Sequence, residues 1–487
     1  MDFTSFSNII NGKQCGALKS YHGINPATEE PLWDVPCAAE ADLDRAVEAA
    51  QGAFHAWSST TFEDRCDMVK RYAEAFLTYE KEFIELLMKE TGKPIDVADR
   101  EIHSSYEGLI ETSERFPWAG VECKSQILMS SLAKFTLPVE TLKDDKKTAS
   151  VRYVPLGIVG AICPWNLGAF AKIAPALVTG NCIIVKPSPY TPYTTLKAVE
   201  IGQSIFPPGV LQALGGNEKL GPWMVSHPGI QKISFTGSIP TGKTILEKCA
   251  KTMKRVTLEL GGNDACIVCG DVDIEKTAPA VVLAAFKNSG QICVASKRIY
   301  VHQSIYRPFL EAMASYAQSL KVGDPFNSDT DIGPIQNAMQ FTKVKSFLDD
   351  CKGQGYRFVA GGGRTGCTKG YFIQPTIIDD PPEDSKIVTE EPFGPIIPVQ
   401  PWCEDEEVIN RSNNTRTGLG ACIWSKDIDH ADRLARKLEV GNIYINSPLR
   451  PDWRVFFSGH KESGIGGERG VQGLLAYCNA QAVHIYG

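Results

Sequence analysis

One of the fifteen cysteines in the chain follows a segment suited to nucleophilic chemistry. Cys293 comes directly after Ser289-Gly290-Gln291-Ile292, where a predicted helix ends and an irregular turn begins. A glycine at such a junction lets the backbone approach closely, and the turn leaves N–H groups free to face a reacting oxygen. A free cysteine also packs commonly as a small hydrophobic residue. The segment is therefore compatible with a catalytic thiol and with a structural one.

Two polar residues at the ends of predicted strands could assist such a thiol. Glu259 ends an apolar strand, and a carboxylate in that place is either paired within the fold or active as a general base. Asn166 follows Pro164-Trp165 after another strand, where its amide could donate to an oxyanion or close a turn. Ligand and catalytic groups collect at the carboxyl ends of parallel strands, which makes both residues candidates.

Three other segments could bind a ligand. Gly237 and Ser238 join a strand to a helix, which suits a pyrophosphate at the helix N-terminus. The GxGxxG fingerprint is absent, however, and a plain turn would give the same pattern. Lys186, just past a strand end, could reach a ribose or phosphate, or could be a solvated surface lysine. Glu391 and Phe393 lie in a proline-rich loop, which either exposes an acid and an aromatic ring or serves as an ordinary connector.

A Cys-x-x-Cys pair, Cys266 and Cys269, lies in a strand-like run. Alternation along a strand places the two thiols on opposite faces of the sheet. No second pair of cysteines or histidines follows at zinc-ligand spacing. The sequence therefore predicts a structural role for both thiols and no metal site.

The segments that must position these residues alternate between helices and strands. Apolar positions three and four residues apart predict a helix from Leu43 to Trp57 and a second from about Asp64 to Thr91. Short apolar runs between helical stretches predict a doubly wound parallel sheet, with the same alternation continuing beyond it. The predicted strands are Gly157–Ile162, Ile183–Val185, Val210–Leu214, Ile230–Phe235, Val256–Leu258, Ala265–Val268 and Arg298–Val301. The stretch from Val121 to Ser150 is typical of extended strands joined by an exposed turn at 143–147.

Size, charge and hydropathy exclude several classes of protein. A chain of 487 residues, of which 43% are hydrophobic, can bury a large core without disulfides. A net charge of -7 provides no basic field for nucleic acid or an anionic membrane. No apolar run reaches the roughly 18 residues of a membrane span, and Met1-Asp2-Phe3-Thr4 lacks the features of a signal peptide. A cytoplasmic protein with free thiols is the simplest interpretation.

Together, these segments resemble the NAD(P)-dependent aldehyde dehydrogenase superfamily. The resemblance runs from Asn25-Pro26-Ala27-Thr28 to Lys461–Gly466, and its most specific parts are Thr257–Asn263 and Gly290–Cys293. It implies an α/β fold of the aldehyde dehydrogenase type, with two doubly wound α/β domains and a small β oligomerisation arm.

The same resemblance implies a discontinuous domain arrangement. Residues 1–120 and 153–256 would form the cofactor-binding domain, and 257–465 the catalytic domain. Residues 121–152 and 466–487 would form an oligomerisation arm and C-terminal strand. A homodimer or homotetramer is expected from that intersubunit sheet.

The implied reaction is the oxidation of a small-molecule aldehyde to a carboxylic acid. Cys293 resembles the nucleophile that forms a thiohemiacetal, and the Asn166 amide with the Cys293 backbone N–H resembles its oxyanion hole. A thiol adduct supplies the sp³ carbon that hydride donation needs. Loss of the hydride to a nicotinamide gives a thioester, and Glu259 resembles the base that activates water to hydrolyse it.

NAD or NADP is the implied cofactor. The residues that resemble its contacts are Lys186 for the adenosine ribose, Gly237 and Ser238 for the pyrophosphate, Glu391 for the nicotinamide ribose with Phe393 nearby, and Gly221, Pro164, Trp165 and Leu260. Pro189 stands where many NAD-selective relatives place a glutamate. Loss of that charge removes repulsion of a 2′-phosphate, so NAD is expected and NADP is also compatible.

Two segments depart from the family pattern. After Asn166 the interval to Lys172 is about three residues short, nearly one helical turn, which alters a helix that normally lines the substrate tunnel. The stretch from Ser447 to His460 is also unusual and is expected at the substrate entrance. Its two arginines, at positions 450 and 454, could anchor the carboxylate of a semialdehyde or lie on the surface.

Two alternatives to the hydrolytic enzyme stay open. A CoA-acylating semialdehyde dehydrogenase would pass the thioester to CoA, but relatives of that type usually lack the base, so Glu259 favours water. A family member with weakened catalysis and a binding or structural role is favoured only by the short segment after Asn166.

Overall fold

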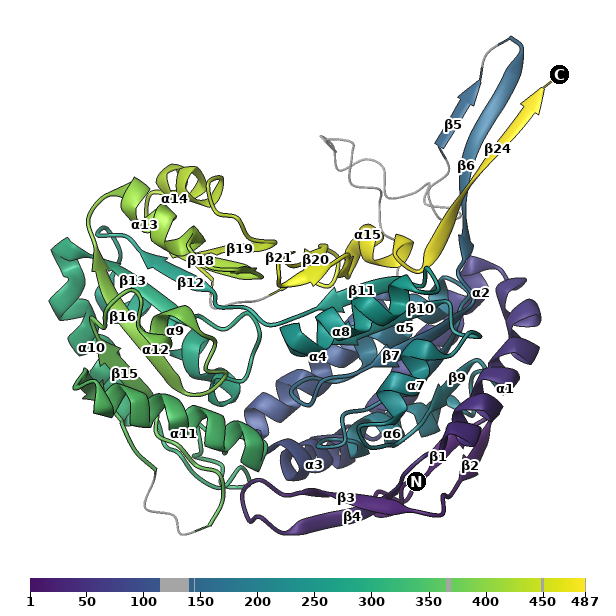
Figure 1. Ribbon diagram of the computed structural model, residues 1–487, viewed down its shortest axis with the longest axis horizontal. Helices are drawn as coiled ribbons and strands as arrows, with labels where there is room; N and C mark the ends of the chain where they lie inside the picture. The colour runs from purple at the N-terminus through teal and green to yellow at the C-terminus, as the bar shows by residue number, and fades with distance from the viewer. Residues whose placement is uncertain (114–139, 144, 365–368, 448–450, 487) are drawn as a thin grey trace.

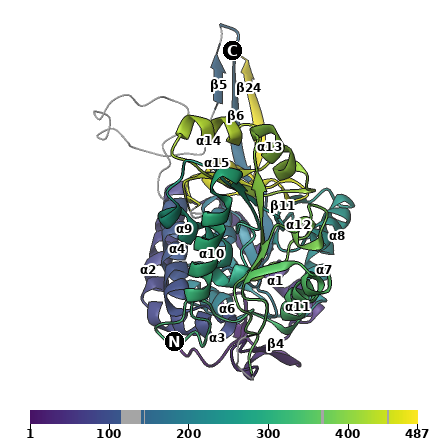
Figure 2. The same ribbon diagram turned by 90° about the vertical axis from the view of Figure 1, so that its left-hand side faces the viewer.

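The computed structural model describes residues 1–113, 140–143, 145–364, 369–447 and 451–486. Two α/β lobes lie side by side, and a three-stranded arm extends from one of them with the C-terminus at its tip (Figure 1). Turning the molecule by 90° shows the same arm rising clear of both lobes (Figure 2). The predicted fold class, two doubly wound α/β units with a β arm, is confirmed.

The first lobe is built on an eight-stranded sheet with the order β2-β1-β9-β8-β7-β10-β11-β22. Its central five strands are parallel, and the outer three are antiparallel to their neighbours. Every strand predicted for this sheet is present, because buried parallel strands are continuous apolar runs. The strands are β1 (Asn8–Ile10), β2 (Lys13–Cys15), β7 (Ile158–Ile162), β8 (Cys182–Lys186), β9 (Leu211–Ala213), β10 (Lys232–Thr236), β11 (Arg255–Glu259) and β22 (Gly464–Ile465).

Helices cover both faces of this sheet, with α5 and α6 against α2 on one face and α7 against α1 and α8 on the other. The predicted first helix is confirmed, and it buries Leu43 and Trp57. The predicted second helix is two helices, broken at Thr78-Tyr79, where no glycine or proline signals the turn. The helices are α1 (Glu40–Ser58), α2 (Phe62–Leu77), α3 (Glu80–Thr91), α4 (Ile95–Ser113), α5 (Phe170–Val178), α6 (Tyr193–Gly202), α7 (Leu220–Ser226) and α8 (Ile239–Ala250).

The second lobe contains a seven-stranded sheet with the order β14-β15-β16-β13-β12-β18-β19. Only β14 is antiparallel to its neighbour. Cys266 and Cys269 pack into hydrophobic clusters on opposite faces, as alternation along β12 predicts. The strands are β12 (Ala265–Val268), β13 (Arg298–His302), β14 (Arg357–Ala360), β15 (Thr376–Asp379), β16 (Ile396–Trp402), β18 (Gly420–Trp424) and β19 (Asn442–Ile445).

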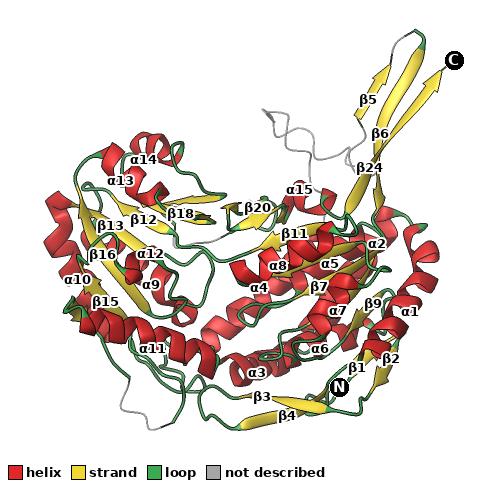
Figure 3. Cartoon of the chain, in the orientation of Figure 1, coloured by secondary structure: helices red, strands yellow, loops and turns green. Residues whose placement is uncertain are grey.

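Helices also flank the second sheet (Figure 3). α9 and α10 pack on each other over β13, and α14 packs against β18 and β19. These helices are α9 (Ile274–Phe286), α10 (Tyr306–Ser319), α11 (Ala338–Gly353), α12 (Lys386–Thr389), α13 (Asp405–Asn413) and α14 (Ile428–Ala435), with two 3₁₀ turns, η1 (Lys287–Gly290) and η2 (Gln303–Ile305).

The arm is a sheet of β5 (Glu140–Lys143), β6 (Lys147–Pro155) and β24 (Cys478–Tyr486). β6 pairs with β24 over its full length, from Pro155 opposite Cys478 to Lys147 opposite Tyr486. The predicted hairpin is therefore confirmed for β5 and β6, while residues 121–139 of that prediction lie outside the described residues.

The C-terminal segment returns from the second lobe to the first. It contains β21 (His460–Lys461), which pairs with β17 (Thr417–Gly418) of the second lobe, and β22, which pairs with β11 of the first. The same segment also contains β20 (Phe457–Ser458), β23 (Gly467–Glu468) and α15 (Gly470–Leu475), of which β20 pairs with β23. Near the N-terminus, a separate hairpin consists of β3 (Ser20–Ile24) and β4 (Pro31–Pro36). The predicted domain boundary at 257 falls within β11, so the exact division stays a prediction.

Over the described residues, no helix is both long enough and apolar enough to cross a membrane.

Candidate active site

The predicted site residues of the first lobe lie at one edge of its sheet. Asn166 follows β7, Lys186 ends β8, Gly237 follows β10 and Glu259 ends β11. The strand order reverses between β7 and β10, and ligands of open α/β sheets bind at the carboxyl ends beside such a reversal. The sheet therefore brings these four residues to the place where a dinucleotide would bind.

Cys293 lies at the end of a turn with unusual backbone geometry. Asn288, Ser289 and Gly290 have φ of 53°, 57° and 71°, three left-handed residues in a row. The turn is held by Ser289 Oγ, which donates to Gly333 O at 2.7 Å. Gln291 Nε2 donates to Asn288 O at 2.9 Å, closing the turn on itself. Left-handed conformations cost energy for residues with a side chain, so the surrounding contacts must fix this turn.

The turn is tightly packed around Gly290, and a substitution at this position tests that packing. A Cβ at this position would lie 2.2 Å from Gly394 O. We expect Gly290→Ala to destabilise the protein by about 2–5 kcal/mol, combining left-handed strain with overpacking. Displacement of the turn should also lower aldehyde-oxidising activity. Chemical denaturation and steady-state rates measure the two effects.

Gly355 is a matched control for that substitution. It has the same φ, 71°, but no atom lies within 4 Å of its Cβ position. Gly355→Ala should lower the free energy of unfolding only by the left-handed strain, about 1–2 kcal/mol, and should leave activity unchanged. Equal behaviour of the two variants would contradict the assigned packing at Gly290.

Cys293 is a half-buried residue, and its thiol lies among charged groups. Burial raises the pKa of the Cys293 thiol to about 12, an effect that Lys297 opposes and that Asp264, Glu259 and Glu391 reinforce. The thiol is thus protonated at neutral pH in this state, and attack on an electrophile requires a group that accepts its proton.

Glu259 is a buried carboxyl without a hydrogen-bond partner among the described residues. Burial raises the pKa of Glu259 well above its ordinary value, and repulsion by Glu468 adds to the rise. Glu468 is itself paired with Lys172 of α5 at 2.5 Å. A raised pKa makes the carboxylate a stronger base, and its two unpartnered oxygens can accept a proton from a thiol or a water.

The Asn166 amide is fixed toward the same turn. Its Nδ2 donates to Gln291 O at 3.0 Å, and its backbone carbonyl accepts from Lys93 Nζ at 2.7 Å. Lys93 is buried and pairs with Glu101. Because an amide nitrogen has two hydrogens, one N–H of Asn166 stays available beside the Cys293 turn.

Residues predicted for the adenosine and pyrophosphate side lie close together. Lys186 is buried, and among the described residues its Nζ donates only to Pro187 O, at 3.2 Å. A Cβ on Gly221 would lie 4.0 Å from Lys186 Cε. Ser238 caps α8 with its hydroxyl, which accepts from Thr241 N. Gly237 allows the turn between β10 and α8, because a Cβ at this position would lie 2.4 Å from the Phe235 ring.

The residues predicted for the nicotinamide side come from both lobes. Trp165 and Phe393 meet edge to face, with ring centroids 5.4 Å apart. Glu391 pairs with Lys297 at 3.2 Å and accepts from Gly262 N at 3.3 Å. Leu260 is buried directly after β11. The geometry fits a dinucleotide along this edge, since it offers a backbone-lined turn, a buried lysine with spare donors and an acid beside two aromatic rings.

Sequence reasoning did not find several residues that fix these groups. Lys297 donates to Cys293 O at 2.5 Å in addition to its pair with Glu391. Gln340 of α11 donates to Pro392 O and Phe393 O at 2.8 and 2.9 Å. The spacing of Lys297 four residues after the thiol was the only available signal, because the other contacts join segments far apart in sequence.

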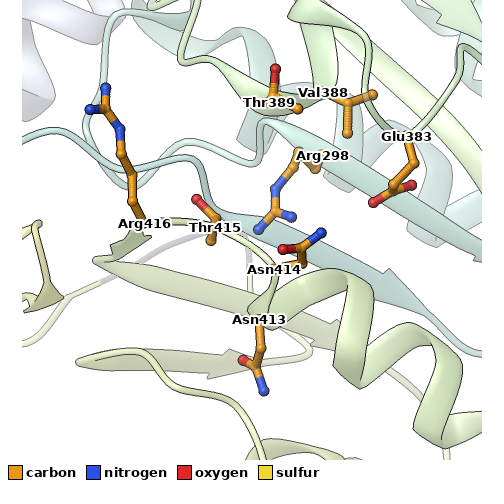
Figure 4. A pocket seen from close by; sticks show the side chains of 8 residues that line it. All are labelled: Arg298, Glu383, Val388, Thr389, Asn413, Asn414, Thr415 and Arg416. Atoms are coloured by element: carbon orange, nitrogen blue, oxygen red, sulfur yellow. The ribbon is translucent and has the colours of Figure 1, made fainter.

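The structure also contains a polar pocket and a polar surface cluster that the sequence did not predict. One is a pocket around Arg298, lined also by Glu383, Val388, Thr389 and residues 413–416 (Figure 4). The Arg298 guanidinium is already bound there to three backbone carbonyls at 2.8–3.0 Å. The other is a surface group of Glu80, Asp99 and His103. Neither contains a predicted site residue.

The fold and the strand-order reversal define an α/β protein of the dinucleotide-binding kind. Residues 14–483 match a model of the aldehyde dehydrogenase family. The chain is 44% identical to aldehyde dehydrogenase LUC3 from a Fusarium species, over all of both chains. It is also 36% identical to an aldehyde dehydrogenase of Agaricus bisporus, covering 98% of this chain and 94% of the relative. The chain therefore belongs to the aldehyde dehydrogenase family, a family of oxidoreductases.

Solved structures agree with this membership. The NAD+ complex of the Bacillus cereus aldehyde dehydrogenase superposes with a TM-score of 0.92 at 32% identity, covering 99% of this chain and 96% of that one. A structure titled as an E. coli NADP-dependent enzyme gives a TM-score of 0.92 at 29% identity, covering 99% and 98%.

Proposed function

We propose that the protein oxidises an aldehyde to a free carboxylic acid with NAD or NADP, through a thioester on Cys293. The observation that carries the proposal is the thiol of the half-buried residue Cys293 within electrostatic reach of Glu259, whose buried oxygens have no partner among the described residues. Kinetics at 340 nm with a panel of aldehydes and either cofactor provide the direct test.

The residues divide the reaction between them. Cys293 Sγ attacks the aldehyde carbon as its proton passes to solvent water, and the free N–H of Asn166 with the Cys293 backbone N–H stabilises the resulting oxyanion. A bound nicotinamide dinucleotide supplies the acceptor for the hydride that leaves this carbon. Glu259 then removes a proton from water, which attacks the thioester and releases the acid and the Cys293 thiol.

Asn166→Ala should lower kcat about 10²–10³-fold, because one oxyanion donor contributes that much in other enzymes. Cofactor binding should stay intact, since the Asn166 amide nitrogen donates to Gln291 O of the Cys293 turn. Asn410→Ala, an exposed asparagine of α13, is the control. A kcat equal to that of the unmodified protein would remove Asn166 from the mechanism.

Both cofactors are compatible with the adenosine side of the site. Lys186, Gly221, Gly237 and Ser238 would hold the adenosine and pyrophosphate, and Pro189 places no carboxylate against a 2′-phosphate. Glu391, Phe393, Trp165, Pro164 and Leu260 would surround the nicotinamide half. The relatives include structures with either cofactor. The ratio of kcat/KM for NAD and NADP measures the preference.

We also propose a homodimer or homotetramer in the cytoplasm. Among the described residues, β5 and β24 are the edge strands of the arm, and Leu142, Ile485 and Tyr486 are exposed on it. Exposed apolar side chains on an unpaired sheet edge favour pairing with another subunit. All cysteines in the described part of the chain are free thiols, which suits a reducing compartment. Light scattering of the purified protein measures the subunit number.

A further inference from the structure

A guanidinium beside the reacting residues has no part in the chemistry proposed above. Arg469 lies between β23 and α15 at φ 64° and ψ 168°, a conformation that residues with a side chain rarely adopt. Its charge interacts with those of Glu468, Cys293 and Glu259. Arg469 therefore lies at the same site, on the side formed by the C-terminal segment.

Two aromatic rings hold the Arg469 guanidinium. Its central carbon lies 4.3 Å from the centroid of the Trp453 ring and 5.1 Å from that of Phe457. Trp453 is itself fixed on α4, where its ring covers Gly108 and its Nε1 donates to Ser104 Oγ at 3.2 Å. These cation–π contacts set the plane of the guanidinium but accept none of its N–H groups.

Among the residues that the structure describes, none accepts a hydrogen bond from the Arg469 guanidinium. Its Nη1 is buried and has no hydrogen-bond partner, and no carboxylate of the described residues lies within ion-pair distance. Glu468, its neighbour in sequence, is paired with Lys172 instead. Burial lowers the pKa of Arg469, because its charge is poorly solvated. A cation with a buried and unpartnered donor is costly unless an anion reaches it.

The two arginines first considered as substrate anchors are less suitable. Arg454 is exposed, and its Nε and Nη2 already donate to Asp452 at 2.9 and 2.7 Å. Arg450 lies outside the described residues. Arg469 has free donors and borders a small cavity that Ala171 of α5 also lines, directly after the shortened segment.

We propose that Arg469 binds a carboxylate carried by the aldehyde substrate, so that the preferred substrate is a short semialdehyde. The aldehyde carbon would lie at Cys293 and the carboxylate at the guanidinium. The inference rests on the proposed function, since it assigns specificity to the same reaction. A guanidinium presents parallel N–H donors that match a carboxylate. Trp453 and Phe457 orient those donors before the substrate arrives, which reduces the ordering cost of binding.

Kinetics with matched aldehydes test this assignment. The probes are succinic and glutaric semialdehyde against butanal and pentanal. The wild-type protein should have the higher kcat/KM with the semialdehydes. Arg469→Met should lower that value about 100-fold, chiefly through KM, as expected for loss of one partner of a buried charge pair, with little change for the neutral aldehydes. Arg454→Met, on the same segment, should keep the wild-type ratio.

Ligand binding without turnover gives a second readout. Calorimetric titration of the protein with succinate or glutarate should show binding that Arg469→Met abolishes. Arg469→Lys, which keeps the charge but not the paired donors, should weaken it. Arg469→Met should melt no earlier than wild type, because it removes an uncompensated buried charge.

The possible outcomes distinguish the carboxylate-binding role of Arg469 from the proposed aldehyde oxidation on which it rests. Equal losses with charged and neutral aldehydes would overturn the anchor and assign Arg469 an electrostatic effect on Cys293. Wild-type oxidation of pentanal with no preference for semialdehydes would also overturn the anchor but leave the proposed function standing. A wild-type protein that oxidises none of the four aldehydes with either cofactor would overturn the function itself.

Discussion

Cys293→Ala should abolish NAD(P)-dependent aldehyde oxidation while leaving the fold and dinucleotide binding in place. The substitution removes the only atom that can form the proposed covalent adduct. Loss of an enzyme nucleophile lowers kcat by up to about 10⁶-fold. The Cys293 backbone contacts to Lys297 do not depend on the side chain, so the turn should keep its conformation. Steady-state rates and cofactor titration measure the two expectations.

An exposed thiol provides the control for this variant. Cys403 lies on the surface, away from the predicted site, and Cys403→Ala should retain full activity. Mass spectrometry after incubation with an aldehyde and cofactor should detect an acyl adduct on residue 293 of the active protein. Substantial turnover by Cys293→Ala would refute the covalent mechanism.

Glu259→Gln should uncouple the two halves of the reaction. Glutamine keeps the shape of the side chain but cannot take a proton from water, so the thioester should form and then persist. We expect a burst of reduced cofactor approaching one equivalent per site, followed by turnover about 10²–10⁴-fold slower than wild type. Stopped-flow absorbance at 340 nm measures burst and steady state together.

Glu247→Gln on the exposed face of α8 is a matched control and should behave as wild type. CoA added to Glu259→Gln also tests the alternative acyl acceptor. A CoA-acylating enzyme would regain fast turnover and release acyl-CoA, whereas a hydrolytic enzyme would not. Unchanged steady-state turnover in Glu259→Gln without CoA would refute the base assignment.

The same variant should change stability in a pH-dependent way. Because the folded-state pKa of Glu259 is raised by burial, the folded protein binds more protons than the unfolded chain above the ordinary value of 4.5. Stability from this group therefore falls as pH rises from 4.5 through the raised pKa. Relative to wild type, Glu259→Gln should be more stable at pH 8 than at pH 4.5, and denaturation at both values measures the difference. A difference independent of pH would contradict the raised pKa.

The parallel strands and the positions of several candidate site residues were predictable because their signals are local. Each buried strand is a short apolar run, and Asn166, Lys186 and Glu259 follow directly from the ends of such runs. The family resemblance then assigned roles that strand topology alone does not give. The sheet edge holds these residues where the sequence predicts them, although their roles stay proposals.

Other features could not be predicted because their causes are distant in sequence or carry no pattern. The helices α2 and α3 separate at Thr78 without a glycine or proline. Asn288 and Ser289 adopt left-handed conformations, and contacts with Gly333, Pro334 and Gln291 hold them there. Arg469 gains its environment from Trp453 and from Gly108, more than 340 residues earlier in the chain.

The run of left-handed residues before Cys293 has a consequence for laboratory evolution of this protein. Residues 288–290 combine backbone strain with close neighbours, so random libraries there should yield few functional clones whatever aldehyde is selected for. Libraries directed instead at positions 453, 457 and 469 would vary the residues around the path to Cys293 Sγ and leave the turn at 288–290 unchanged. Selection for new substrates should therefore enrich changes in the C-terminal segment and return the native sequence at 288–290.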